Sequence, residues 1–317
     1  MLKRILFLII FIAPAAFSQQ QVWHLDNGQT WSEVSDDSSD GFLLAVSEVK
    51  ALVSRGRAQK ARAAYSDLKE KYPQLAGADY DAFVEAEILY AKREYAKAAK
   101  AYSDFLDNYP DSGLYGASLE RQHSIATAFL TGEKLTLLKF FRVNAYEQGS
   151  EIMRNIADKA GDSPAAKRAL SSLARYMEQR GAYEEAYHAW TDVSGRWPTG
   201  KMGMDSLYGM ARSLSNAYKG PGYDATTLES SKSYYQRFQE RYPHEAREID
   251  IEQSLYEIDA ALAQKDLEIA GYYQRTGSIT AANLYYQGII DGWPNSSAAT
   301  IAAERMEELA AGESETE

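Results

Sequence analysis

The sequence predicts an all-α protein: a solenoid of about six helix-turn-helix units that ends in a C-terminal capping helix. The main observation is a recurring motif. Alanine is followed four residues later by an aromatic residue, seven residues after that by a second aromatic residue, and then by proline. Copies occupy residues 61–73, 98–110, 186–198, 231–243 and 282–294, with Ser231 replacing alanine in the fourth copy. Five of the 8 prolines close a copy, so the chain is a repeat protein.

Each copy has the properties of the second helix of a helical hairpin. Residues four apart lie on one helical face, where the small residue allows a neighbouring helix to approach and the aromatic fills the space beside it. Proline, and the restriction that it places on the preceding residue, ends the helix. An apolar-periodic helix precedes each copy, and short polar turns such as 91–95, 179–183 and 274–278 join the two.

One copy is degraded, because the distance between Pro110 and Pro198 corresponds to about two units. Pro164 is its predicted end, with Ile152 and Ile156 replacing alanine and the first aromatic, and Ser163 replacing the second. The predicted units are 42–73, 78–110, 115–164, 165–198, 203–243 and 250–294, followed by a capping helix at 295–310.

The third unit also contains an insertion at residues 130–149. Its apolar side chains indicate additional local core or, alternatively, a patch that binds a partner. These side chains are Phe129, Leu137, Leu138, Phe140 and Phe141.

The two ends of the chain are expected to lie outside the solenoid, which spans residues 42–310. Residues 1–18 have a positive start, a short apolar run and small residues before Gln19, so they predict a cleaved secretory signal. Residues 19–41 are expected to be a flexible segment with a small hairpin around Asn27-Gly28 and a helix N-cap at Asp40. Residues 311–317 are expected to form a disordered acidic tail.

Composition narrows the classes of function. The formal net charge is -11, which disfavours nucleic acid and anionic lipid as ligands. The absence of cysteine removes disulfides, thiolate metal sites and a cysteine nucleophile. No histidine lies at metal-ligand spacing, the 36–47 segment lacks the final glutamate of a calcium loop, and no phosphate loop, nucleophile elbow or HExxH motif occurs. The expectation is therefore a non-enzymatic protein without cofactor, metal or catalytic residues.

The length of the units and their late alanine-aromatic-proline signature resemble the tetratricopeptide repeat. Residues 270–309 are more specific: a Tyr-Tyr pair, a short turn, an aromatic pair, an aromatic-proline step and a short final helix. Together with the predicted signal, they resemble the BamD family of outer-membrane β-barrel assembly. The sequence departs from that family by lacking the acylated cysteine and by having six units rather than five.

The resemblance implies a periplasmic scaffold, peripheral at the outer membrane and without a direct lipid anchor. Its implied partners are the barrel-assembly subunit and unfolded outer-membrane proteins. The same fold also suits a periplasmic scaffold for cell-envelope synthesis or division, or a repeat platform serving a hydrolase. The family's positional pattern places six residues in a groove that binds a partner. For the aromatic residues at positions 80 and 83, the alternative is that they belong to the core between repeats. These residues are Lys50, Ser54, Tyr80, Phe83, Glu87 and Tyr90.

Overall fold

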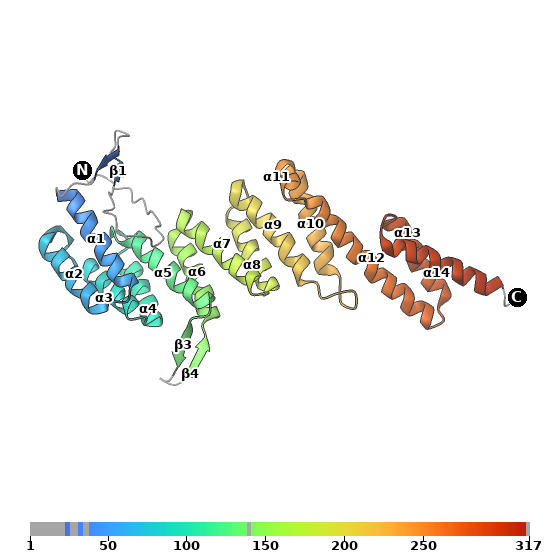
Figure 1. Ribbon diagram of the computed structural model, residues 1–317, viewed down its shortest axis with the longest axis horizontal. Helices are drawn as coiled ribbons and strands as arrows, with labels where there is room; N and C mark the ends of the chain where they lie inside the picture. The colour runs from blue at the N-terminus through green and yellow to red at the C-terminus, as the bar shows by residue number, and fades with distance from the viewer. Residues whose placement is uncertain (1–22, 26–30, 34–37, 138–140, 315–317) are drawn as a thin grey trace, which may run out of the picture. The chain divides into compact units, whose positions relative to one another are not determined.

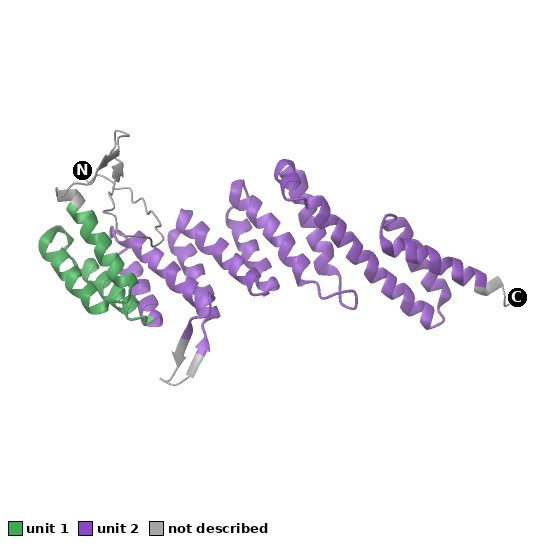
Figure 2. Ribbon diagram, in the orientation of Figure 1, with its two compact units in different colours: residues 1–94 green, residues 95–317 purple. Residues whose placement is uncertain are grey.

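The computed structural model describes residues 23–25, 31–33, 38–137 and 141–314, and almost all of them are helical. The chain divides into two compact units, residues 1–94 and 95–317 (Figure 2). By sequence order alone, the described long helices fall into six successive pairs: α1–α2, α3–α4, α5–α6, α7–α8, α9–α10 and α12–α13. This arrangement confirms the all-α repeat fold and the number of units expected from the motif.

Unit 1 contains three long helices that pack on one another. They are α1 (Ser38–Ser54), α2 (Ala58–Lys71) and α3 (Ala78–Ala91). Ahead of them, strands β1 (Trp23–Leu25) and β2 (Trp31–Glu33) pair antiparallel, with Leu25 opposite Trp31. The small hairpin predicted around Asn27-Gly28 is therefore present. The predicted signal at residues 1–18 lies outside the described residues, and so does the turn of this hairpin.

Unit 2 is a succession of helices in which each packs against its neighbours in sequence (Figure 1). Helices α5, α7 and α9, the first members of successive hairpins, also contact one another in turn. The helices of this unit are α4 (Tyr95–Asn108), α5 (Tyr115–Leu130), α6 (Tyr146–Ala160), α7 (Pro164–Gln179), α8 (Tyr183–Arg196), α9 (Gly200–Ala217), α10 (Thr226–Arg241), α11 (Pro243–Glu248), α12 (Ile251–Arg275), α13 (Ile279–Gly292) and α14 (Ser297–Ser314).

A common turn ends the first helix of most hairpins. The second residue after the helix adopts positive φ, at Gly56, Arg93, Gly181 and Gly277. The next amide then donates to a carbonyl five residues back, as from Ala182 to Met177, at 2.9 Å. This is the Schellman arrangement, which satisfies the last carbonyls of a helix and favours glycine at the left-handed position. The short polar turns predicted from the sequence are built in this way.

The small residue and the first aromatic of the repeated motif lie in the core of the packed helices. Its small residues are completely buried at positions 61, 98, 186, 231 and 282. The aromatic residue four positions later is also buried in each copy, and Tyr102 has an exposed fraction of 0%. The second aromatic of the motif falls at the helix end, and Trp197 and Trp293 are the residues that follow α8 and α13. The packing role predicted for the motif is confirmed.

The third unit has a different register from the predicted one. Ile152 is only half-buried, whereas Met153 is completely buried. Four residues earlier, a Cβ on Gly149 would lie 3.0 Å from the carbonyl oxygen of Ala126 on α5. Gly149 and Met153 are therefore the small and large residues of this copy. The assignment of Ile152 to the small buried position is wrong, whereas Ile156 is buried as predicted. Counting back from Pro164 misled the prediction, because Pro164 begins α7 instead of ending α6.

The insertion in the third unit forms a β-hairpin that projects from the helices α5 and α6 (Figure 1). Strand β3 (Lys134–Leu137) pairs antiparallel with β4 (Phe141–Asn144), with Lys134 opposite Asn144. The sequence predicted additional local core at this insertion but did not predict that it forms β-strands. Residues 138–140 at the tip lie outside the described part of the chain.

Two predicted boundaries shift outward. Helix α1 begins at Ser38, so Asp40 lies within its first turn and is not its N-cap. Helix α14 continues to Ser314, because Ala310 and Ala311 favour helix, and part of the predicted tail is therefore helical. The role of α14 as a cap is confirmed, since Ala298, Ala299 and Ala302 pack into a core cluster with α12 and α13.

Candidate protein-binding clefts

The six residues predicted to form a groove lie in unit 1, on α1 and α3. Lys50 and Ser54 are exposed, and Tyr90 is half-buried. Tyr80 and Phe83 are buried, each with an exposed fraction of 6%, and Glu87 is buried at 1%. Burial of the two aromatics supports the alternative that they belong to the core between repeats.

Hydrogen bonds account for the positions of two of these residues. The Tyr80 hydroxyl donates to the carbonyl of Tyr65 at 2.9 Å, and the Tyr65 hydroxyl donates to the Glu87 carboxylate at 2.9 Å. Burial, with a smaller contribution from the charge of Asp81, raises the pKa of Tyr80 to about 12. These contacts fix α3 against α2 inside unit 1. A role of the six residues in binding stays a prediction.

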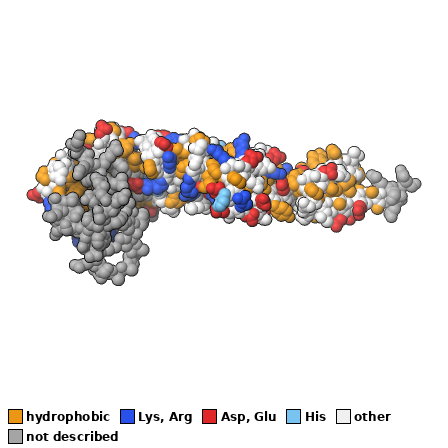
Figure 3. Space-filling model, turned by 90° about the horizontal axis from the view of Figure 1, so that it is seen from above, with side chains coloured by type: hydrophobic (Ala, Val, Ile, Leu, Met, Phe, Trp, Pro, Cys, Tyr) orange, Lys and Arg blue, Asp and Glu red, His pale blue; other side chains and the backbone are white. Residues whose placement is uncertain are grey.

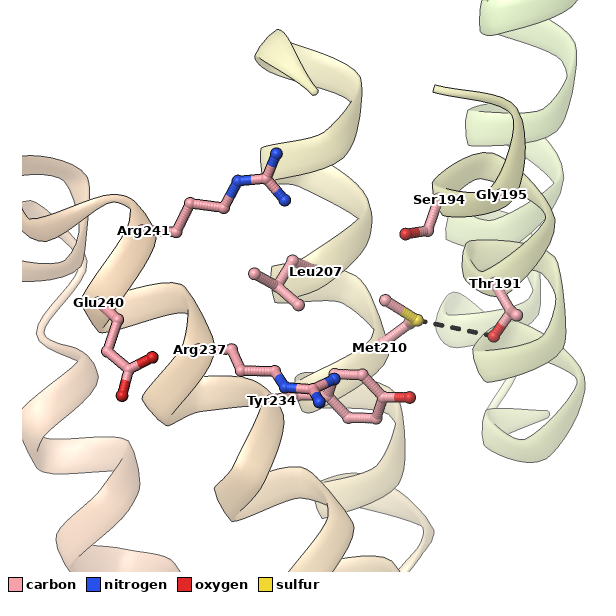
Figure 4. Close-up of a pocket in the computed structure, with 9 residues that line it drawn as sticks. All are labelled: Thr191, Ser194, Gly195, Leu207, Met210, Tyr234, Arg237, Glu240 and Arg241. Carbon is pink, nitrogen blue, oxygen red and sulfur yellow. Dashed lines mark hydrogen bonds between the residues drawn. The ribbon is translucent and has the colours of Figure 1, made fainter. Parts of the chain in front are cut away.

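Unit 2 contains a cleft that the sequence did not predict, between helices α8 and α10 with α9 as its floor (Figure 4). Its cavity volume is about 660 Å³, within the range of ligand-binding pockets. We call it the α8–α10 cleft. It is lined by Thr191, Ser194, Gly195, Leu207, Met210, Tyr234, Arg237, Glu240 and Arg241.

The wall formed by α10 carries the charge of the cleft. Arg237 lies over the Tyr234 ring, with its guanidinium carbon 5.9 Å from the ring centre, and Arg241 lies over Tyr242 at 5.6 Å. The Tyr234 hydroxyl lies 3.1 Å from the hydroxyl of Tyr187 on α8. That hydrogen bond, together with burial, raises the pKa of the Tyr234 phenol.

A second cleft lies between α4 and α6, with α5 as its floor, and has a volume of about 360 Å³. Its cationic side chains are already paired. The Lys100 amine is 2.7 Å from the Asp104 carboxylate, and Lys159 pairs with Asp107. The two clefts occupy equivalent positions, each between the second helices of consecutive hairpins, but only the α8–α10 cleft presents arginines without an ion pair among the described residues.

A network around Glu178 joins the helices behind the α8–α10 cleft. This carboxylate on α7 accepts hydrogen bonds from the Trp190 indole at 3.1 Å and from the Ser213 hydroxyl at 3.1 Å, and it pairs with Arg212. Trp190 is the first aromatic of the motif in α8, and the other two partners lie on α9. The network therefore fixes α8 and α9, which carry one wall and the floor of the cleft.

The described residues show neither a metal site nor a membrane span. Within them, no three His, Asp or Glu side chains gather as ligands for a metal ion. None of the described helices combines the length and the apolar character needed to cross a bilayer. Acidic and basic side chains are interspersed on the face shown in Figure 3.

The fold and its clefts define a class: helical-repeat proteins that bind other proteins. Comparison with known families agrees. The tetratricopeptide repeat family matches residues 42–74 and 85–112, and a family described as "Outer membrane lipoprotein", to which BamD belongs, matches residues 202–312. Over these residues the chain is similar to BamD-like tetratricopeptide-repeat proteins. Both families consist of non-enzymatic scaffolds that bind proteins, and the outer membrane lipoprotein family faces the periplasm.

Comparisons with individual proteins add little to this assignment. No curated protein matches the sequence. Among solved structures, the human IFIT1 dimer with PPP-AAAA is 10% identical, and the alignment covers 87% of this chain and 76% of that chain with a TM-score of 0.21.

Proposed function

We propose that the chain is a non-enzymatic periplasmic scaffold for the assembly of outer-membrane β-barrel proteins. The observation that carries the proposal is the family match over residues 202–312, which spans α9–α14 apart from the first and last residues. The proposed partners are the barrel-assembly subunit and unfolded outer-membrane proteins. Stacked hairpins suit this role, because they present grooves and clefts along successive repeats.

The proposal includes a route to the envelope. Residues 1–18 have the pattern of a secretory signal, which would deliver the chain to the periplasm. Acylation requires a cysteine, and this sequence contains none. We therefore propose that contact with a protein partner recruits the chain to the outer membrane.

Affinity capture from envelope extracts tests the proposal. The bait is residues 19–317 with a C-terminal tag, and captured proteins are identified and quantified by mass spectrometry. Enrichment of the barrel-assembly subunit over an untagged control supports the proposal. Enrichment of peptidoglycan-synthesis or division proteins without that subunit would contradict it and favour a scaffold of cell-envelope synthesis or division.

A further inference from the structure

We propose that the α8–α10 cleft binds an extended acidic peptide segment of a partner protein, with two carboxylates at alternate positions pairing with Arg237 and Arg241. The inference rests on one part of the proposed function, namely that the chain binds other proteins. It names the chemistry of one partner segment and the residues that would hold it.

The two arginines are available for such a ligand. Neither forms an ion pair with any carboxylate in the described part of the chain, although this chain is rich in acidic residues. Each lies over a tyrosine ring, which stabilises the cation. Guanidinium groups bind carboxylates through two parallel hydrogen bonds, and an anionic ligand is therefore the natural partner of this wall.

Their spacing selects an extended ligand. Arg237 and Arg241 are four residues apart on α10, which places them about 6 Å apart along the helix axis. Alternate residues of an extended peptide point to the same side and are about 6.6 Å apart. A peptide that runs along α10 can therefore present carboxylates at positions n and n+2 to the two arginines.

The rest of the cleft accepts the intervening residue. Leu207 and Met210 on α9 form an apolar floor, and Gly195 on α8 leaves room in the opposite wall. A Cβ built on Gly195 would meet no atom within 4 Å. Glu240 is the acidic residue among those that line the cleft, and among the described residues it forms no ion pair with Arg237 or Arg241.

Charge complementarity confines an acidic ligand to this cleft. The net charge of -11 repels acidic peptides from most of the surface, so that binding requires a local excess of cations. The α4–α6 cleft offers none, because Lys100 and Lys159 are paired with Asp104 and Asp107. The observations therefore favour the α8–α10 cleft over its equivalent in the earlier repeats.

Fluorescence anisotropy with the full chain tests the inference. The probe is a labelled peptide, Ser-Gly-Glu-Leu-Glu-Gly-Ser, and the comparison peptide replaces both glutamates with glutamine. We expect saturable binding of the glutamate peptide and at least about tenfold weaker binding of the glutamine peptide, equivalent to about 1.4 kcal/mol. Equal affinity for the two peptides, or no binding of either at about 1 mM, would overturn the inference.

Matched variants locate the binding site. The double variant Arg237→Gln/Arg241→Gln should lose at least about tenfold in affinity. The control Arg154→Gln/Arg247→Gln removes the same charge from exposed positions outside the cleft and should retain binding. A third variant, Gly195→Leu, places a side chain in the cleft at a position where a Cβ meets no atom within 4 Å, and should also block the peptide.

Equal losses in the two arginine double variants would overturn the assignment to the cleft, with circular dichroism confirming that both are folded. Capture of the barrel-assembly subunit is scored separately with the same variants. Capture without peptide binding would overturn the cleft assignment and leave the proposed function standing. Peptide binding without capture of the barrel-assembly subunit would support the cleft assignment and contradict the proposed function.

Discussion

At the residue scale, close packing of a small residue against a large one is the feature that builds this fold. The pairing of Trp190 with Gly209 shows how exact it is. A Cβ on Gly209 of α9 would lie 2.3 Å from Cε2 of the Trp190 ring on α8, well inside van der Waals contact. Because Trp190 is buried and its indole is held by Glu178, the ring has little freedom to move away.

Gly209→Ala should therefore destabilise the protein. Overpacking of this kind costs typically about 1–3 kcal/mol, which should exceed the gain of about 1 kcal/mol from replacing a helical glycine with alanine. The measurement is the midpoint of urea unfolding followed by circular dichroism.

Gly288→Ala on α13 is the matched control, because a Cβ there would meet no atom within 4 Å. It should leave the midpoint unchanged or raise it. A Gly209→Ala midpoint as high as that of the control would contradict the packing described for α8 and α9.

The sequence predicted the residues of the regular motif but not these glycines. Alanine and aromatic residues at fixed spacing before a proline are visible as a repeat. Gly149 and Gly209 carry no such signal, since their function depends on which ring or backbone lies opposite. Gly149 could have been found by searching the third unit for any small residue four positions before a large one.

At the element scale, α10 connects the repeats of the C-terminal half. It packs against α9 on one side and α12 on the other, and its motif residue Tyr235 is buried between them. Burial, with a smaller effect from Tyr208, raises the pKa of Tyr235 to about 12. An unfolded tyrosine titrates near 10.

This shift predicts a loss of stability in base. Between pH 10 and 12 the unfolded state releases the Tyr235 proton while the folded state retains it, so stability is full below about pH 10 and falls as the pH rises to 12. The contribution of this pKa shift to the unfolding free energy is about 3 kcal/mol. Tyr235→Phe should reduce the fall in unfolding free energy over this window by about that amount.

Tyr256→Phe serves as the control, because Tyr256 is exposed on α12. The fall measured for this variant should match that of the unchanged protein. If Tyr235→Phe behaved in the same way as the control, the phenol of Tyr235 would not be buried as described.

Elements without a repeated pattern were the hardest to predict. The hairpin β3–β4 follows the same Schellman turn as the other first helices, since Gly132 has positive φ and the Glu133 amide donates to Ala128. After that turn, the chain forms two strands in place of an immediate second helix. Nothing in the periodicity of residues 130–149 distinguishes this outcome from extra helix.

At the scale of the whole molecule, the repeats and the family match lead to the same account. The order of the units and the capping helix were predictable from the sequence, because each unit repeats the same local chemistry. The α8–α10 cleft was not predictable from the sequence, because its residues come from three helices and do not form a sequence motif. Arg237 and Arg241 are unremarkable in sequence and become a site only when α10 packs beside α8.

The most direct test of the central claim is a binding measurement between two purified proteins. Residues 19–317 are titrated with the periplasmic region of the barrel-assembly subunit in an isothermal calorimeter. The account predicts saturable binding with a Kd of about 1 µM or tighter, equivalent to about -8 kcal/mol. An absence of binding at about 100 µM, with both proteins folded, would contradict a direct role of this scaffold in barrel assembly.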